Sequence, residues 1–287
     1  MPSAPAISVV VMAIHSDARA VEAVASLHDP VLPIEIIVVN TGTGSLVPRL
    51  ADTLDRVVLV ESPSLRLPGG TRNVGIAEAR GPIIAFLASD CLATPGWAAH
   101  RIAAHAAAEA VSSAILPAPV AGGRVRLSSL AIHMLMYCRR DPAFPPERTV
   151  RYGVSYRREL FNRLGTFLED RVVGEDTEFN ARLPAQPAWA PDVVTLHRNP
   201  PSFAAALADS WQRGARLQHW MRDQTPHPTA RSLRWAIGAA VDAMTMLKYA
   251  PPKRRGSLLA AAPLVWCLAF ARMGGALSQM GRKTGLS

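Results

Sequence analysis

The first half of the chain alternates short, uninterrupted apolar runs with helical segments, and this rhythm constrains the fold more than any other feature. The first run, 7–12, is rich in β-branched residues, and similar runs cover 34–39 and 82–87. Runs of this length without polar alternation are typical of strands buried on both faces of a sheet. With helices between them, they predict an α/β fold with an open, mostly parallel twisted sheet flanked by helices.

Other elements are expected from the same kinds of signal. Ser16 is the expected N-cap of a helix over 17–27. Further strands are expected at 56–60, 114–116, 151–156 and 191–196, and further helices at 71–79, 95–110, 130–137, 158–164 and 175–183. The segment 117–148 is rich in Pro, Gly and Arg around its short helix, so we expect it to be a mobile loop over a site.

The composition changes near residue 200. Residues 1–197 carry 18 Lys and Arg against 19 Asp and Glu, a net charge of −1, whereas residues 198–287 carry 13 against 3, a net charge of +10. The basic part also reads as helical, with breaks where prolines cluster. We therefore predict an α/β domain over 1–200 and a basic, apolar helical C-terminal region over 201–287.

The basic region carries a helical apolar pattern. After the cluster Lys253-Arg254-Arg255, apolar residues recur at steps of three or four, at Leu259, Ala262, Trp266, Phe270, Met273 and Leu277. Basic charge combined with tryptophan and apolar surface favours an anionic membrane surface over nucleic acid as a partner. A helical extension that packs on the main domain, or a dimer contact, is the alternative.

Other sequence features bear on the compartment. The longest uncharged apolar run, 257–271, has 15 residues, so no spanning helix of about 20 residues is expected. No basic segment precedes the first apolar run, so we expect no signal peptide and a cytoplasmic protein, peripheral on the inner face of the cell membrane. Cys91, Cys138 and Cys267 stand far apart, which excludes a disulfide scaffold and the usual zinc ribbons.

Candidate binding residues follow from the fold, because ligands bind outside the carboxyl ends of the strands in open α/β sheets. The polar residues expected at those ends are His15, Ser16, Asp17, Asn40, Thr41, Ser89, Asp90, His197 and Arg198. Neither Gly-x-Gly-x-x-Gly nor a P-loop sequence is present, so a nicotinamide-binding domain and a P-loop are not supported. Structural roles remain open as well: Asp90 can cap a turn, and Glu175 and Asp176 can stabilise a helix N-terminus.

Three blocks of sequence resemble the inverting glycosyltransferases of family 2, which have the GT-A fold. The blocks are IEIIVVNTGTGS, PGGTRNVGIAEARGPIIAFLASDCLATPGW and SYRRELFNRLGTFLEDRVVGEDTEFNARL, and the resemblance covers roughly 7–198. The middle block is the more specific, because an Arg-Asn-x-Gly element followed by a strand, an Asp and Pro-Gly-Trp rarely arises by chance. The resemblance implies an enzyme that transfers a sugar from a nucleotide-diphosphate donor to an acceptor hydroxyl with inversion, in bacterial cell-surface polysaccharide or glycolipid synthesis.

The resemblance implies catalytic and metal-binding roles by position. Asp176 matches the family's expected base, with Glu175 beside it. Asp90 matches the last Asp of the family's DxD motif, which is expected to hold Mg²⁺ or Mn²⁺ on the diphosphate. His197 matches a further metal contact.

The resemblance also implies a nucleotide-sugar site. Arg72 and Asn73 match an Arg-Asn pair near the donor, and Asn40-Thr41 stands where the family has an acidic pair that contacts the base. The amide oxygen of Asn40 can still accept a hydrogen bond from a base. The full set expected to bind the nucleotide sugar is His15, Asn40, Thr41, Arg72, Asn73, Ser89 and Asp90.

The sequence departs from the family pattern at three points, and the first is the replacement of the acidic pair by Asn40-Thr41. Ala88 replaces the first Asp of the DxD motif, and Met-Ala-Ile-His at 12–15 replaces the usual Pro-x-Tyr-Asn. The alternative is therefore a degenerate glycosyltransferase-like binding or scaffold protein without turnover, although the retained acids argue against it. A nucleotidyltransferase is a further alternative. It would normally carry a Gly-rich basic loop after the first strand, and His15-Ser16-Asp17 is not such a loop. The expected partners are a nucleotide-sugar donor, a saccharide or lipid-linked acceptor and an anionic membrane surface, without nucleic acid, and the C-terminal helices could support an oligomer.

Overall fold

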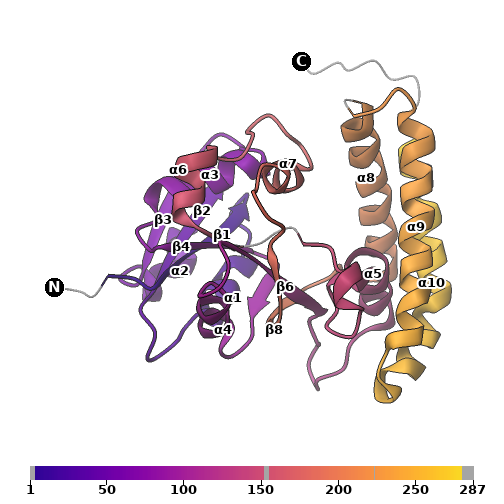
Figure 1. The fold of residues 1–287 in the computed structure, drawn as a ribbon, viewed down its shortest axis with the longest axis horizontal. Helices are drawn as coiled ribbons and strands as arrows, with labels where there is room; N and C mark the ends of the chain where they lie inside the picture. Colours follow the sequence, from indigo (N-terminus) through magenta and orange to yellow (C-terminus); the bar gives the residue numbers. More distant parts are fainter. Residues whose placement is uncertain (1–3, 152–154, 223, 280–287) are drawn as a thin grey trace. The chain divides into compact units, whose positions relative to one another are not determined.

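The structure, a computed structural model, describes residues 4–151, 155–222 and 224–279. It divides the chain into two compact units (Figure 1). The first unit comprises Met1–Ile115 and Val150–His197, and the second comprises Leu116–Thr149 and Arg198–Ser287. The second unit thus contains both the C-terminal helices and Leu116–Thr149, a segment that the composition assigns to the domain 1–200. The domain boundary near residue 200 stays a prediction.

An eight-stranded mixed sheet with the order β3-β2-β1-β4-β7-β6-β8-β5 lies in the first unit. Its strands are β1 (Ile7–Ile14), β2 (Ile34–Thr41), β3 (Val57–Ser62), β4 (Ile83–Ala88), β5 (Cys91–Ala93), β6 (Ala110–Pro117), β7 (Ser155–Arg157) and β8 (Ala188–His197). Strand β1 pairs in parallel with β2 and β4, and β2 with β3, whereas β7 pairs antiparallel with β4 and β6, and β5 with β8. The predicted α/β fold with C-terminal helices is confirmed, and its parallel part is β3-β2-β1-β4.

Helices cover both faces of this sheet, as Figure 1 shows. One face packs against α1 (Arg19–Ser26), α2 (Val47–Leu50) and α4 (Trp97–Ala104). The other packs against α3 (Pro68–Glu78), α6 (Arg158–Leu164) and α7 (Glu175–Ala181). Alternate residues of β1 and β2 belong to the two cores, which is why these strands read as continuous apolar runs.

Two local predictions in the first unit are wrong. Ser16 does not cap α1: its φ is +57°, its hydroxyl donates to the Thr43 carbonyl, and α1 begins at Arg19, whose backbone N–H donates to Asp17 instead. Helix α4 ends at Ala104 and β6 already begins at Ala110, because burial between neighbouring elements outweighs the helix propensity of the alanine-rich sequence. The three-residue strand β5 is not anticipated by the sequence pattern. The expected strand at 151–156 overlaps 152–154, which lie outside the described residues.

The second unit is a helical assembly with a core of its own. It contains α5 (Leu127–Tyr137), the 3₁₀ turns η2 (Cys138–Arg140) and η3 (Pro146–Arg148), α8 (Phe203–Arg222), α9 (Pro228–Tyr249) and α10 (Pro252–Leu277). Helix α5 packs on α9 and α10, and eight of its eleven residues are buried. The expectation of a mobile loop over a site at 117–148 is therefore wrong for α5, because its apolar residues form part of this core.

Two glycines let α8 and α10 approach each other closely. A Cβ at Gly214 would meet the backbone carbonyl of Arg272, and one at Gly275 would meet the carbonyl of Trp211.

A buried carboxylate, Asp141, fixes a second contact within this unit. It accepts hydrogen bonds from His133 Nε2 at 2.9 Å and from Arg254 of α10 at 2.8 Å.

Helix α10 is longer than the uninterrupted apolar run suggests. It spans 26 residues, and its most apolar 18-residue window has a mean hydropathy of 1.5. By length and composition it could cross a membrane, in contrast to the prediction from the run 257–271. A core helix of a soluble protein meets the same criteria, and 39% of this window is buried.

Candidate active site

Polar side chains gather where the parallel strands end. His15 follows β1, Asn40 and Thr41 end β2, and Ser89 and Asp90 follow β4. The register of β1 against β2 and β4 brings these strand ends almost level, so the residues share one edge of the sheet. This is the edge at which open α/β sheets bind ligands.

The turn after β1 holds two consecutive non-glycine residues in a left-handed conformation. His15 has a φ of +52° and Ser16 a φ of +57°. The Thr43 backbone N–H donates to His15 Nδ1 at 3.1 Å, and the Ser16 backbone N–H donates to the Asn40 side-chain oxygen at 3.0 Å. Such strain costs about 1–3 kcal/mol per residue and typically persists at binding sites, where surrounding contacts maintain it.

Asn40 is buried and links three segments. Its amide nitrogen donates to the Glu61 carboxylate and to the Gly44 carbonyl, each at 3.2 Å. Glu61 also accepts hydrogen bonds from the Leu46 backbone N–H at 2.7 Å and from the Ser45 hydroxyl at 3.0 Å. Burial raises the pKa of Glu61, but these three hydrogen bonds outweigh it and lower the pKa below its ordinary value. Sequence reasoning missed Glu61, although it stands directly opposite Asn40 at the end of the next strand.

A cavity of about 420 Å³ opens beside this network. It is lined by Gly42, Thr43, Gly44, Glu61, Ser62 and Pro63. The neighbouring Thr41 is fully buried, and its hydroxyl has no hydrogen-bond partner among the described residues. Asn40 and Thr41, the predicted base-contacting pair, are thus buried and do not line the cavity, whereas Glu61 does.

The structure brings two separate sequence blocks together at an ion pair. Arg72 of α3 donates through Nη1 to Glu175 of α7, and both side chains are largely buried. The Arg72 guanidinium also lies over the rings of Phe86 and Phe167, 5.6 and 5.2 Å from their centroids. The charge of Glu175 is thus compensated inside the protein.

Asn73 bridges α3 to the segment before α7. Its side chain accepts a hydrogen bond from the Phe167 backbone N–H at 3.0 Å and donates to the Phe167 carbonyl at 2.9 Å. It also donates to the Glu169 carboxylate at 2.9 Å. The hydrogen-bonding groups of Asn73 therefore hold this segment in place.

Asp176 is placed differently from its neighbour Glu175. It is half-buried at the second position of α7. Its Oδ1 atom accepts a hydrogen bond from the Thr177 backbone N–H at 2.7 Å, and the Thr177 hydroxyl lies 3.4 Å from the same atom. Among the described residues, its Oδ2 atom has no hydrogen-bond partner. Asp176 can therefore accept a proton at Oδ2.

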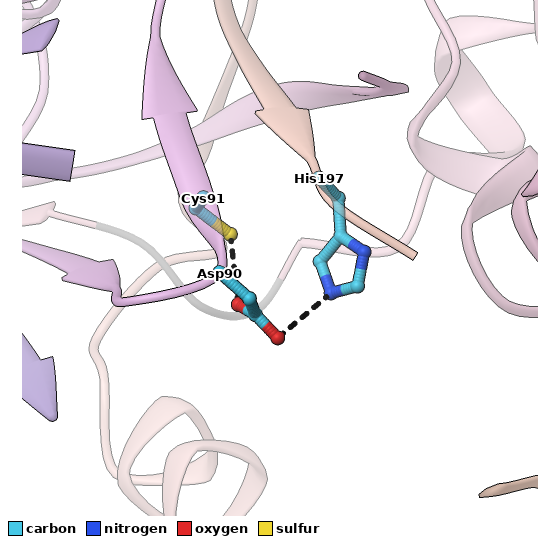
Figure 2. A group of neighbouring side chains, drawn as sticks. All are labelled: Asp90, Cys91 and His197. Atoms are coloured by element: carbon cyan, nitrogen blue, oxygen red, sulfur yellow. Dashed lines mark hydrogen bonds and ion pairs between the residues drawn. The ribbon is translucent and has the colours of Figure 1, made fainter. Parts of the chain in front are cut away.

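Asp90, Cys91 and His197 form a compact group (Figure 2). His197 Nε2 lies 3.6 Å from Asp90 Oδ2, and the Cys91 thiol donates to Asp90 Oδ1 at 3.5 Å. Asp90 is partly exposed, whereas Cys91 and His197 are buried. The structure thus brings together the two residues that the sequence predicts as metal ligands and adds a thiol. A carboxylate and an imidazole suit a divalent cation such as Mn²⁺.

A second acid stands close to this group. Ser89 donates through its hydroxyl to Asp17 at 2.6 Å, and Arg19 pairs with Asp17 at 2.8 Å. Burial alone would raise the pKa of Asp17, but the hydrogen bonds from Arg19 and Ser89 outweigh it and hold the pKa at about 2. The sequence places Asp17 and Ser89 at strand ends, but their contact and the role of Arg19 appear only in the fold.

Comparisons with known proteins agree with this architecture. The family described as glycosyl transferase family 2 matches residues 8–174. A mannosyltransferase from Pyrobaculum calidifontis, solved in complex with GDP-Man and Mn²⁺, is similar in structure with a TM-score of 0.58 and 19% identity, covering 97% of this chain and 87% of that one. TarS 1–349 of S. aureus, solved with UDP-GlcNAc, has a TM-score of 0.49 and 15% identity, covering 95% and 91%. No curated protein matches the chain in a sequence search.

The fold and the family match together define a glycosyltransferase. The chain belongs to glycosyl transferase family 2, because the match extends over more than half of its length. The family expected from the three sequence blocks is thereby confirmed.

Proposed function

We propose that this glycosyltransferase moves a sugar from a nucleoside-diphosphate donor to an acceptor hydroxyl with inversion at the anomeric carbon. The observation that carries the proposal is the contrast between adjacent acids on α7. Glu175 is buried against Arg72, whereas Asp176 keeps one carboxylate oxygen without a described partner. Asp176 is therefore the better base, and Glu175 positions the helix through its ion pair.

Inversion follows from a single displacement. The acceptor oxygen attacks the anomeric carbon while the bond from that carbon to the diphosphate oxygen breaks, and the hydroxyl proton passes to Asp176 Oδ2. One positioned base suffices for this step and typically contributes 10²–10⁴-fold in rate. The diphosphate leaves with the bonding electron pair.

The donor would lie along the edge formed by the ends of the parallel strands. The base would enter the cavity near Glu61, supported by Asn40 behind it. Asp90 and His197 would hold Mg²⁺ or Mn²⁺, which supplies positive charge for the leaving diphosphate. Because the similar mannosyltransferase was solved with GDP-Man and Mn²⁺, GDP-mannose is the first donor to test.

We further propose that the second unit binds an anionic membrane surface. Four exposed apolar residues of α10, Leu259, Trp266, Phe270 and Leu277, fall within about 40° around the helix axis at 100° per residue. Lys253 and Arg255 are exposed at the start of the same helix, whereas Arg254 between them pairs with Asp141, and each basic residue near anionic lipid contributes about 1 kcal/mol. This surface supports a lipid-linked acceptor and a peripheral position on the cytoplasmic face, in surface polysaccharide or glycolipid synthesis.

Vesicle co-sedimentation tests the membrane proposal. The full-length protein should bind phosphatidylglycerol vesicles at low salt, and high salt should release part of it. A Trp266→Ser/Phe270→Ser variant should lose this binding, whereas Val31→Ser, which removes an exposed apolar residue of the first unit, should retain it. Equal binding by all three proteins would contradict the proposal.

A donor panel tests the catalytic proposal. The protein with Mn²⁺ should release nucleoside diphosphate from one nucleotide sugar of the panel, and NMR of the glycoside formed should show the inverted anomeric configuration. Retention of configuration would contradict the single displacement. Binding of a donor without any release would favour the alternative, a glycosyltransferase-like binding or scaffold protein.

A further inference from the structure

The thiol beside the two expected metal ligands has no part in the proposed reaction. Cys91 Sγ, one carboxylate oxygen of Asp90 and one imidazole nitrogen of His197 all lie within 4.8 Å of one another. The backbone explains why they meet: Cys91 and His197 stand directly opposite each other in the antiparallel pair of β5 and β8, so their side chains share one face. Asp90 precedes Cys91 in the turn out of β4, and Figure 2 shows its carboxylate between the other two side chains.

The spacing of these atoms fits a single small cation. Metal–ligand distances of about 2.0–2.3 Å in a tetrahedral arrangement place ligand atoms about 3.3–3.7 Å apart. The Cys91 sulfur lies 3.5 Å from one oxygen of Asp90, and the His197 nitrogen lies 3.6 Å from the other. The Cys91 sulfur and the His197 nitrogen lie within 4.8 Å of each other. These two atoms would approach each other by up to about 1 Å to bind one ion together.

The chemistry of this donor set differs from that of an all-oxygen site. Mg²⁺ prefers oxygen ligands in octahedral geometry, whereas a set of thiolate, imidazole and carboxylate favours Zn²⁺ and other softer divalent metals. Three protein ligands are also the usual number at a zinc site that keeps one position open.

We propose that Cys91 is a third protein ligand at the cation site of Asp90 and His197, so that the site binds Zn²⁺ and Co²⁺ more tightly than Mg²⁺. On binding, the Cys91 S–H bond breaks, its electron pair forms the sulfur–metal bond, and the proton leaves to solvent. This inference rests on the proposed function only for the place of the cation. It holds for metal binding whether or not sugar is transferred.

Cobalt spectroscopy of the full-length protein tests the proposal directly. The background variant is Cys267→Ser, because Cys267 is exposed and could bind metal on its own. Cys138 can stay, since it is buried and burial raises the pKa of its thiol to about 12. After chelator treatment, addition of Co²⁺ should produce a near-ultraviolet thiolate-to-cobalt charge-transfer band, and Zn²⁺ should abolish it.

The matched variant adds Cys91→Ser to that background. We expect the charge-transfer band to disappear and the affinity for Zn²⁺, measured by competition with a chromogenic chelator, to fall by at least ~10-fold. The affinity for Mg²⁺ should stay within about twofold, because the oxygen and nitrogen ligands remain. Circular dichroism checks that the variant is folded, and Cys91→Ala provides a second test if Ser disturbs the strand pair.

Two results would overturn the proposal. One is the absence of a thiolate band in the Cys267→Ser protein, and the other is a band that persists after Cys91 is replaced. Neither result bears on sugar transfer, which the donor panel measures separately. Conversely, if the protein shows the band but releases no nucleoside diphosphate, the metal site is supported and the proposed reaction is contradicted.

Discussion

The two units bury charge in different places. In the first unit, β-branched strand residues form a large part of the core, and Asp90 and His197 stand where β4 and β8 end, with the Asp90 side chain 28% exposed. In the second unit, alanines pack with larger apolar side chains of α5, α9 and α10, and Asp141 is fully buried between His133 and Arg254. Charge at the end of a strand can meet a ligand, whereas charge enclosed between helices fixes their positions. The comparison therefore predicts that site variants of the first unit affect turnover and that Asp141 variants affect stability.

The largest effect is expected at Asp141. Asp141→Asn leaves His133 and Arg254 without their carboxylate, and breaking a buried pair in this way costs about 3–5 kcal/mol. Urea unfolding followed by tryptophan fluorescence should show the loss, because four of the six tryptophans lie in the second unit. Asp242→Asn is the matched control: Asp242 pairs with the more exposed Arg148, so its loss should cost about 1 kcal/mol or less. Equal losses in the two variants would contradict the distinction.

Asp176→Asn should have the opposite profile. We expect turnover to fall by at least ~10²-fold, because the side chain keeps its shape and loses the proton acceptor. Donor affinity and the urea midpoint should change little. Glu178→Gln is the control on the same helix, since Glu178 pairs with Arg182 in an i,i+4 contact. Turnover near the wild-type level in Asp176→Asn would remove Asp176 as the base.

Acid should weaken the second unit through Asp141. Burial raises the pKa of this carboxyl, but the hydrogen bonds and charges of His133 and Arg254 outweigh burial and lower the pKa from 3.8 to about 2. A carboxyl whose pKa is lower in the folded than in the unfolded protein stabilises the fold at every pH above its unfolded-state pKa. This stabilisation is lost as the pH falls from about 4 to about 2. The loss amounts to about 2 kcal/mol. The difference in unfolding free energy between the wild type and Asp141→Asn should therefore shrink over this range, and a constant difference would contradict the assignment.

The smallest effect is expected at Gly238 of α9, and it contrasts with a glycine at the close approach of α8 and α10. Gly214→Ala would place a methyl group against the Arg272 carbonyl, and overpacking of this kind costs about 1–3 kcal/mol. Gly238→Ala on α9 has nothing within 4 Å and should instead stabilise the protein by up to about 1 kcal/mol. Thermal unfolding of both variants measures the contrast. A stabilising Gly214→Ala would show that the two helices do not need this close approach.

The sequence by itself determined the class of fold and much of the first unit. Uninterrupted apolar runs predict β1, β2 and β4, because strands buried on both faces have no polar side to reveal. Helix α6 matches its predicted bounds, and the breaks between α8, α9 and α10 fall at prolines, because proline removes a donor and clashes in a helix interior. The family also follows from linear motifs, since these are contiguous in sequence.

Only the tertiary structure decided which polar residues meet. The contacts of Asn40 with Glu61, of Arg72 with Glu175 and of Cys91 with His197 join residues between 21 and 106 positions apart, and linear spacing carries no signal for them. The same reason explains why the sequence predicts the helix at 130–137 but places it in a mobile loop and not in a core. Helix α5 is buried by α9 and α10, which lie about a hundred residues further along the chain, and its local sequence does not contain that partner.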